Sequence, residues 1–243
     1  MFMRLFFVWM LASIAAGVHA GCVNQGGPIG AHYRITTTEN ESGKQRVKAF
    51  TLWRMADQVA HQYHGKGKTE LWERAGNGKL RTVHYFDLYH RGIEYAPGEI
   101  RIAHTATDWQ LKYQLLSDKF IETLTREASL VEDCEPLLQY SKTAEGEKIT
   151  LAWLPEQRLI KSYISERPFV TTTWELLDVV TDSDKVQGEF ARRAEFQTTD
   201  YTDIGDNESD PFLMRMINLG HISHGASGFY DQHGHLIGGN HGH

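Results

Sequence analysis

Short runs of β-forming residues separated by turn signals recur along most of the chain, and this pattern constrains the fold more than any other feature. In the first half such runs cover residues 47–54, 58–64, 69–74, 80–87 and 93–96. The Gly76-Asn77-Gly78 sequence between two of them predicts a tight hairpin, because Asn and Gly tolerate the positive φ of such turns. The pattern therefore predicts an antiparallel β-meander.

One segment after this meander has the periodicity of a helix instead. Apolar residues recur every three or four positions from Trp109 through Tyr113, Leu116 and Phe120 to Leu124, and Asp108 precedes them as a helix cap. This spacing builds a single apolar stripe. We expect one long helix whose aromatic stripe packs against the sheet rather than against a ligand.

Strand signals return in the second half of the chain. Residues 149–154 and 159–165 flank a Pro-Glu-Gln turn, residues 170–180 are rich in β-branched side chains, and residues 188–198 are expected to be a last strand after a turn at 183–185. Together the segments predict an α+β class. We expect a curved, mostly antiparallel, half-barrel-like β-sheet with one long helix packed on it and a short C-terminal helix.

The first twenty residues have the features of a signal peptide. Arg4 precedes an apolar run over 5–16, and Val18-His19-Ala20 offers a cleavage site before Gly21. The apolar run is shorter than the about 20 residues of a membrane span. We therefore expect an exported protein, periplasmic or secreted, and foremost in a Gram-negative periplasm. The expected organisation is a signal peptide over 1–20, a polar N-terminal arm over 21–43, a single β-rich domain over 44–220 and a flexible His-rich tail over 221–243.

The chain has two cysteines, Cys22 and Cys134, which support two interpretations. A disulfide between them suits an oxidising compartment and would close a loop of about 110 residues, worth roughly 4 kcal/mol in the chain-entropy model. The alternative is a lipid anchor on Cys22, in which case His19 would stand where leucine is usual and Cys134 would stay unpaired. The disulfide is the preferred interpretation.

Charge and motif content argue against several classes of function. Without Arg4, 24 basic residues face 31 acidic ones, a net charge of −7. This balance argues against a nucleic-acid partner and against an anionic membrane surface, since both require a basic patch. The sequence contains no H-E-x-x-H, C-x-x-C, G-x-S-x-G or phosphate-loop motif. We therefore expect a protein that is not an enzyme.

An acidic run, Asp206-Asn207-Glu208-Ser209-Asp210, lies near the C-terminus. It begins like a calcium loop, but Pro211 stands where such a loop needs glycine and Ile217 where it needs glutamate. We expect Asp210 instead to cap a short helix that has Pro211 at its first position and Gly220 at its end.

The histidine-rich C-terminus is the strongest candidate for a binding site. Six of the 13 histidines lie in the last 23 residues, with glycines between them that allow the segment to wrap an ion. Neutral imidazole is the commonest transition-metal ligand, and ligand softness and affinity order favour Zn²⁺, Cu²⁺ or Ni²⁺. The alternative is a solvated tail that binds nothing. The candidate ligands are His221, His224, His233, His235, His241 and His243.

The strand–Leu-Pro–strand hairpin suggests a family. Leu151-Ala152-Trp153-Leu154-Pro155 is followed by Leu159-Ile160-Lys161-Ser162. Together with the signal segment, the curved meander and the inserted helix, this pattern resembles the LolA/LolB-type periplasmic lipoprotein carriers over residues 47–198. The resemblance implies an apolar concave face that is able to hold acyl chains.

Two functions are therefore expected from the sequence. The first is a non-enzymatic periplasmic protein that binds or buffers a transition metal through its tail. The second is a LolA-like carrier or binding module for a lipid or another small apolar ligand.

The metal hypothesis predicts that the tail accounts for metal binding. When Zn²⁺, Cu²⁺ or Ni²⁺ is titrated into the mature protein in a calorimeter, the heat of binding should disappear in a variant that ends at Gly220, because that variant lacks the six histidines. Equal heats from the two proteins would exclude the tail as the metal site.

Overall fold

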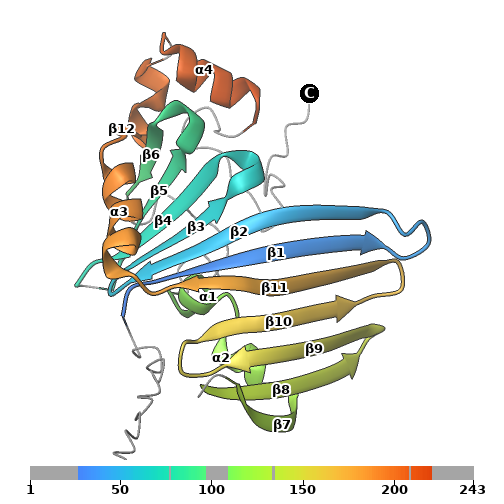
Figure 1. Cartoon of the computed structure of the whole chain (residues 1–243). Coiled ribbons are helices and arrows are strands. Elements are labelled where there is room, and N and C mark those ends of the chain that lie inside the picture. The colour runs from blue at the N-terminus through green and yellow to red at the C-terminus, as the bar shows by residue number, and fades with distance from the viewer. Residues whose placement is uncertain (1–26, 77, 97–108, 133–134, 208, 221–243) are drawn as a thin grey trace, which may run out of the picture.

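The described part of the chain folds into one open, curved sheet of twelve strands with four short helices (Figure 1). The computed structural model describes residues 27–76, 78–96, 109–132, 135–207 and 209–220. The strands are β1 Ile29–Glu39, β2 Gln45–Met55, β3 Gln58–Tyr63, β4 Lys68–Arg74, β5 Leu80–Phe86, β6 Arg91–Tyr95, β7 Thr125–Glu132, β8 Glu135–Ala144, β9 Glu147–Leu154, β10 Leu159–Glu166, β11 Val170–Val180 and β12 Gln197–Asp200. The helices are α1 Trp109–Gln114, α2 Asp118–Glu122, α3 Ser183–Ala194 and α4 Pro211–Asn218, with 3₁₀ turns η1 His64–Lys66, η2 Asp87–Tyr89 and η3 Tyr201–Asn207.

The strands lie in the order β12-β6-β5-β4-β3-β2-β1-β11-β10-β9-β8-β7. Only β12 and β6 pair in parallel, and the other neighbours are antiparallel. The predicted meander corresponds to β2–β6, and the later predicted strands correspond to β9, β10 and β11. The predicted fold class, a curved and mostly antiparallel sheet with helices packed on it, is confirmed.

β1 lies at the centre of the sheet and joins its two halves by pairing with β2 on one side and β11 on the other. The expectation of a polar arm over 21–43 is therefore wrong for residues 29–39. Ile29, Ala31 and Tyr33 are buried at alternate positions, which is the period of a strand with one face against a core. The alternation is not evident in the sequence, because glycine and threonine occupy many positions of this segment.

The predicted long helix is divided into two short helices. α1 ends at Gln114, and Leu115 then takes a φ of 68°, a left-handed conformation that interrupts the helical hydrogen bonds. α2 begins after Ser117, whose hydroxyl accepts a hydrogen bond from the Phe120 N–H, and the chain enters β7 at Thr125. The apolar stripe nevertheless packs against the sheet as predicted.

The segment 188–198, expected to be a strand, is mostly helical. α3 runs through it, and β12 has only four residues. Asp182 starts the helix by accepting hydrogen bonds from two backbone N–H groups of its first turn. Val186 and Arg193 are the buried residues of α3 and lie on one side of it, where Arg193 Nε donates to Asp87 Oδ1 at 3.0 Å. Local periodicity does not indicate this helix, because Arg193 is buried only through its pairing with Asp87, which is distant in sequence.

Alternate strand residues contribute to cores on the two faces of the sheet, and a further buried cluster packs Phe86 and Ile93 against α4. One face of the sheet packs against α1 and α2 in a cluster that includes Phe50, Leu52 and Trp153, and we call it the α1–α2 face. The other packs against α3 in a cluster that includes Trp53 and Val83, and we call it the α3 face.

A buried arginine fastens α1 to the sheet. Arg54 Nη1 donates to the Tyr113 carbonyl at 3.0 Å, and Nη2 donates to the Gln157 carbonyl at 2.6 Å. The Arg54 guanidinium also lies 4.4 Å from the centre of the Tyr113 ring. Burial lowers the pKa of Arg54. Carbonyl oxygens and a ring face therefore compensate the desolvation of this charge.

The C-terminal helix begins as predicted. Asp210 accepts hydrogen bonds from the backbone N–H groups of Phe212 and Leu213, and Pro211 occupies the first turn. Arg91 adds a 2.6 Å ion pair to the capping carboxylate. The helix cap thus also joins α4 to β6.

Replacing either of two glycines by alanine should change the free energy of unfolding, in opposite directions. A Cβ on Gly30 would overlap the buried Trp53 ring, so Gly30→Ala should lower the free energy of unfolding by about 1–3 kcal/mol. Gly188 lies inside α3 with open space around it, so Gly188→Ala should raise that free energy by about 0.5–1 kcal/mol. Urea denaturation measures both changes. A Gly30→Ala protein as stable as the wild type would contradict this packing.

Candidate functional site

A half-buried apolar row crosses the α1–α2 face. Tyr140 lies opposite Leu151, Leu151 opposite Tyr163, Tyr163 opposite Trp174, and Trp174 opposite Ile35. These residues come from β8, β9, β10, β11 and β1, and we call them the apolar row. Leu151 is fully buried, whereas the other four are only partly buried and pack against the main core. Apolar surface therefore remains open to solvent along this row.

The face is more polar on the side of the row that lies toward the β8–β9, β10–β11 and β1–β2 turns. Two residues farther along the strands, the corresponding positions are Lys142, Ile149, Ser165, Thr172 and Thr37. Two residues of a strand span roughly 6.6 Å. The face thus changes from apolar to mostly polar over a short distance.

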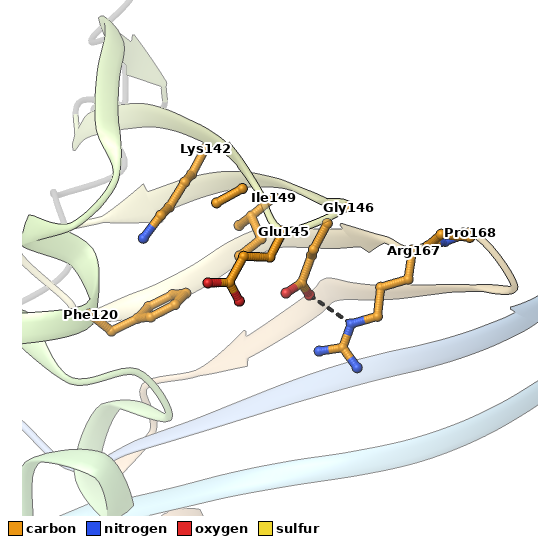
Figure 2. A pocket seen from close by; sticks show the side chains of 9 residues that line it. Phe120, Lys142, Glu145, Gly146, Ile149, Arg167 and Pro168 are labelled. Carbon is orange, nitrogen blue, oxygen red and sulfur yellow. Dashed lines mark hydrogen bonds and ion pairs between the residues drawn. The ribbon is translucent and has the colours of Figure 1, made fainter.

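A pocket lies at the polar side of the row, next to the turn between β8 and β9. Its volume is about 460 Å³. Phe120 of α2 and Ile149 of β9 form its apolar part, and Figure 2 shows Lys142 on the same side as Phe120 with Arg167 across the pocket. The pocket therefore combines apolar and charged surfaces.

One ion pair is already formed inside this pocket. Arg167 Nε donates to Glu147 Oε1 at 3.1 Å, and the Ser165 hydroxyl donates to the same oxygen. The hydrogen bond from Ser165 and the charge of Arg167 outweigh partial burial and lower the pKa of Glu147. Glu147 is consequently an acceptor whose charge is satisfied within the protein.

A second polar cluster lies on the same face, across β3, β4 and β5. His61, Glu70 and His84 occupy directly opposed positions. Burial raises the pKa of Glu70, but Lys68, whose Nζ is 2.7 Å from Glu70 Oε1, and His84 outweigh it and lower the pKa to about 2. Burial lowers the pKa of His84 to about 3 and that of His61 to about 4. Both histidines are therefore neutral at physiological pH.

The groups of this second cluster and their neighbours bind to other parts of the protein. His61 Nε2 donates to the Lys112 carbonyl at 2.8 Å, and the Lys112 ammonium lies 4.3 Å from the centre of the buried Trp72 ring. Within the described part of the chain, no group of His, Cys, Asp or Glu residues is arranged to hold a metal ion. The His61–Glu70–His84 cluster is thus a packed polar element of the core.

The site residues predicted from the sequence are not described by this structure. The six tail histidines, from His221 to His243, and both cysteines, Cys22 and Cys134, lie outside the described residues. Metal binding by the tail and the disulfide remain predictions. No helix in the described ranges is long and apolar enough to cross a membrane.

The residues of the apolar row and the pocket were not among the site residues predicted from the sequence. Tyr163 and Trp174 were predicted only as strand residues, because β-strands commonly contain aromatic side chains. Tyr140 lies in β8, for which no strand range was predicted. The one local signal was Glu145-Gly146, a two-residue turn between β8 and β9 in which glutamate replaces the usual Asn or Asp.

Comparisons with known proteins give structural similarity alone. No protein-family model matches the sequence, and no curated protein matches it either. PNGF-II is similar in structure, with 6% identity and a TM-score of 0.36, over 71% of this chain and 31% of that chain. A putative outer membrane lipoprotein-sorting protein domain from Vibrio parahaemolyticus has 9% identity and a TM-score of 0.31, over 68% of this chain and 92% of the other. A LolA superfamily protein from Nitrosomonas europaea has 8% identity and a TM-score of 0.30, over 66% of this chain and 90% of the other.

LolA superfamily structures are therefore among the similar ones, in agreement with the resemblance seen in the sequence. Identities and TM-scores this low assign neither a ligand nor an activity to the present chain. The chain also spans only 31% of PNGF-II.

The neutral histidines predict how stability depends on pH. The unfolded chain binds a proton at each histidine below pH about 6.5, whereas folded His84 does so only below about 3. Between these two pKa values, acidification therefore lowers the free energy of unfolding by about 1.4 kcal/mol per pH unit for each such histidine. Urea denaturation of His84→Gln between pH about 4.5 and 6 should show a smaller slope by that amount, and His61→Gln/His84→Gln a reduction twice as large. Equal slopes in all three proteins would contradict the buried neutral state.

Proposed function

We propose that the chain is an exported, non-enzymatic binding protein that carries an amphiphilic ligand. The apolar part of the ligand lies along the apolar row, and its polar end lies at the pocket beside the β8–β9 turn. The observation that carries the proposal is the half-buried row of Tyr140, Tyr163, Trp174 and Ile35, which ends in a pocket with charged walls.

The chemistry of the row supports this ligand class. Aromatic rings offer large, flat apolar surface and lose little conformational freedom on contact. Such surface on a soluble protein is stabilised by a ligand or a partner that removes it from water. The polar residues two positions away, among them Lys142 and Thr172, would contact the polar end of the ligand.

The extent of the row limits the size of the ligand. Trp72 and Trp153 are buried in the same core cluster as Ile121 of α2, so this part of the α1–α2 face is filled by protein. A cavity that continues over the whole face, as the carrier hypothesis implies, is not supported. A single acyl chain fits the remaining strip better than a large multi-chain lipid.

Two parts of the proposal come from the sequence. Export follows from the signal peptide expected over residues 1–20, and the non-enzymatic role follows from the lack of a catalytic motif. Metal binding by the tail remains a separate hypothesis, because its histidines belong to a different part of the chain.

Substitution in the apolar row tests this function. A lauroyl lysophospholipid, titrated below its micelle concentration in a calorimeter, should bind the wild type saturably. Tyr163→Ser should weaken that binding about tenfold, since the loss of about 50 Å² of apolar contact with the acyl chain costs about 1.3 kcal/mol. Tyr89→Ser is the matched control, because Tyr89 lies in η2, away from the row, and is 39% exposed. Absence of binding by the folded wild type would exclude the proposed function.

A further inference from the structure

We infer that the pocket beside the β8–β9 turn holds a zwitterionic head group, with its cation on Glu145 and its anion on Lys142. The inference rests on the proposed function, because it specifies the class of amphiphile that the apolar row carries. A primary amine joined to a phosphate, as in a lysophosphatidylethanolamine, has the required chemistry.

The first support is an unpaired cation beside an unpaired anion. Arg167 and Glu147 neutralise each other within the pocket. Among the described residues, neither Lys142 nor Glu145 forms an ion pair or a side-chain hydrogen bond, although both line the same pocket. Figure 2 shows the Glu145 carboxylate and the Lys142 amine on the side of the pocket where Phe120 lies.

This arrangement discriminates between ligand charges. A purely anionic head group that approaches Lys142 also meets the carboxylate of Glu145, and a purely cationic one that approaches Glu145 meets the ammonium of Lys142. A zwitterion satisfies both groups and leaves no like charges in contact. The equal number of charged groups of each sign in the pocket therefore favours a ligand of zero net charge.

The second support is the backbone at Glu145. Glu145 and Gly146 have φ angles of 51° and 77°, so both central residues of the hairpin turn are left-handed. Such turns strongly prefer Asn, Asp or Gly at the first of these positions, where glutamate is strained. Strained residues concentrate at sites where their side chain has a use. Figure 2 shows the Glu145 side chain extending into the pocket.

The third support is continuity with the apolar row. Ile149 of the pocket lies directly opposite Lys142 on β8, two residues from Leu151 of the row. A ligand whose head group fills the pocket would therefore place its first methylene groups on Ile149 and Phe120 before reaching Tyr140 and Tyr163. A volume of about 460 Å³ is in the range of small-molecule sites.

Two lysolipids with the same lauroyl chain test the inference by calorimetric titration of the full-length mature protein. The wild type should bind the zwitterionic lysophosphatidylethanolamine about tenfold more tightly than the anionic lysophosphatidylglycerol, the effect of one charge-assisted contact. Glu145→Asn should abolish this preference, and Lys142→Gln should weaken the binding of both lipids. Glu145→Asn places a favoured residue in the turn, so loss of the preference could not be attributed to unfolding.

Glu156→Asn is the matched control. Glu156 is an exposed acid in the turn at the other end of β9, and its replacement should leave the preference intact. Equal or tighter binding of the anionic lipid by the wild type would overturn the head-group inference and leave the proposed function standing. Binding of neither lipid would overturn both.

Discussion

The antiparallel pairing of β1 with β11 is the interaction on which the rest of the structure depends. It joins strands that are far apart in sequence: Arg34 of β1 donates to Glu175 of β11, 141 positions later, at 3.1 Å. That exposed ion pair contributes little, so the backbone ladder of the two long strands carries the connection. Without it, the chain would form two smaller sheets, each with an open edge at the centre of the present one.

Part of the candidate site depends on this pairing. The apolar row takes Trp174 from β11 and Ile35 from β1, and the register of these two strands places them opposite each other. The same register sets the polar positions two residues farther along, including Thr172 and Thr37. A ligand bound across the row would contact both halves of the sheet, and it would therefore stabilise the folded state by binding to it alone.

Turn and alternation signals predicted most strands, and Asp210 predicted the start of α4, because these features depend on residues close together in the sequence. β1 was not predicted because its buried residues Ile29, Ala31 and Tyr33 lie in a segment rich in glycine, threonine and other polar residues. α3 was mistaken for a strand because its apolar residues are few and Arg193 is buried only by pairing with Asp87. The pocket was not predicted, since Lys142 and Arg167 are brought to its two sides only by the pairing of β8, β9 and β10.

The sequence by itself determined the class of fold, the position of most strands and the chemistry available on each strand. It also supports export and a histidine-rich tail as predictions that are independent of the described fold. Only the tertiary structure decided that residues 29–39 are central, that apolar residues of five strands form one row, and that charged residues gather at its end. The physical reason is that a strand has two faces and no local rule selects its neighbours. Strand order and register make that choice, and they depend on contacts between residues distant in sequence.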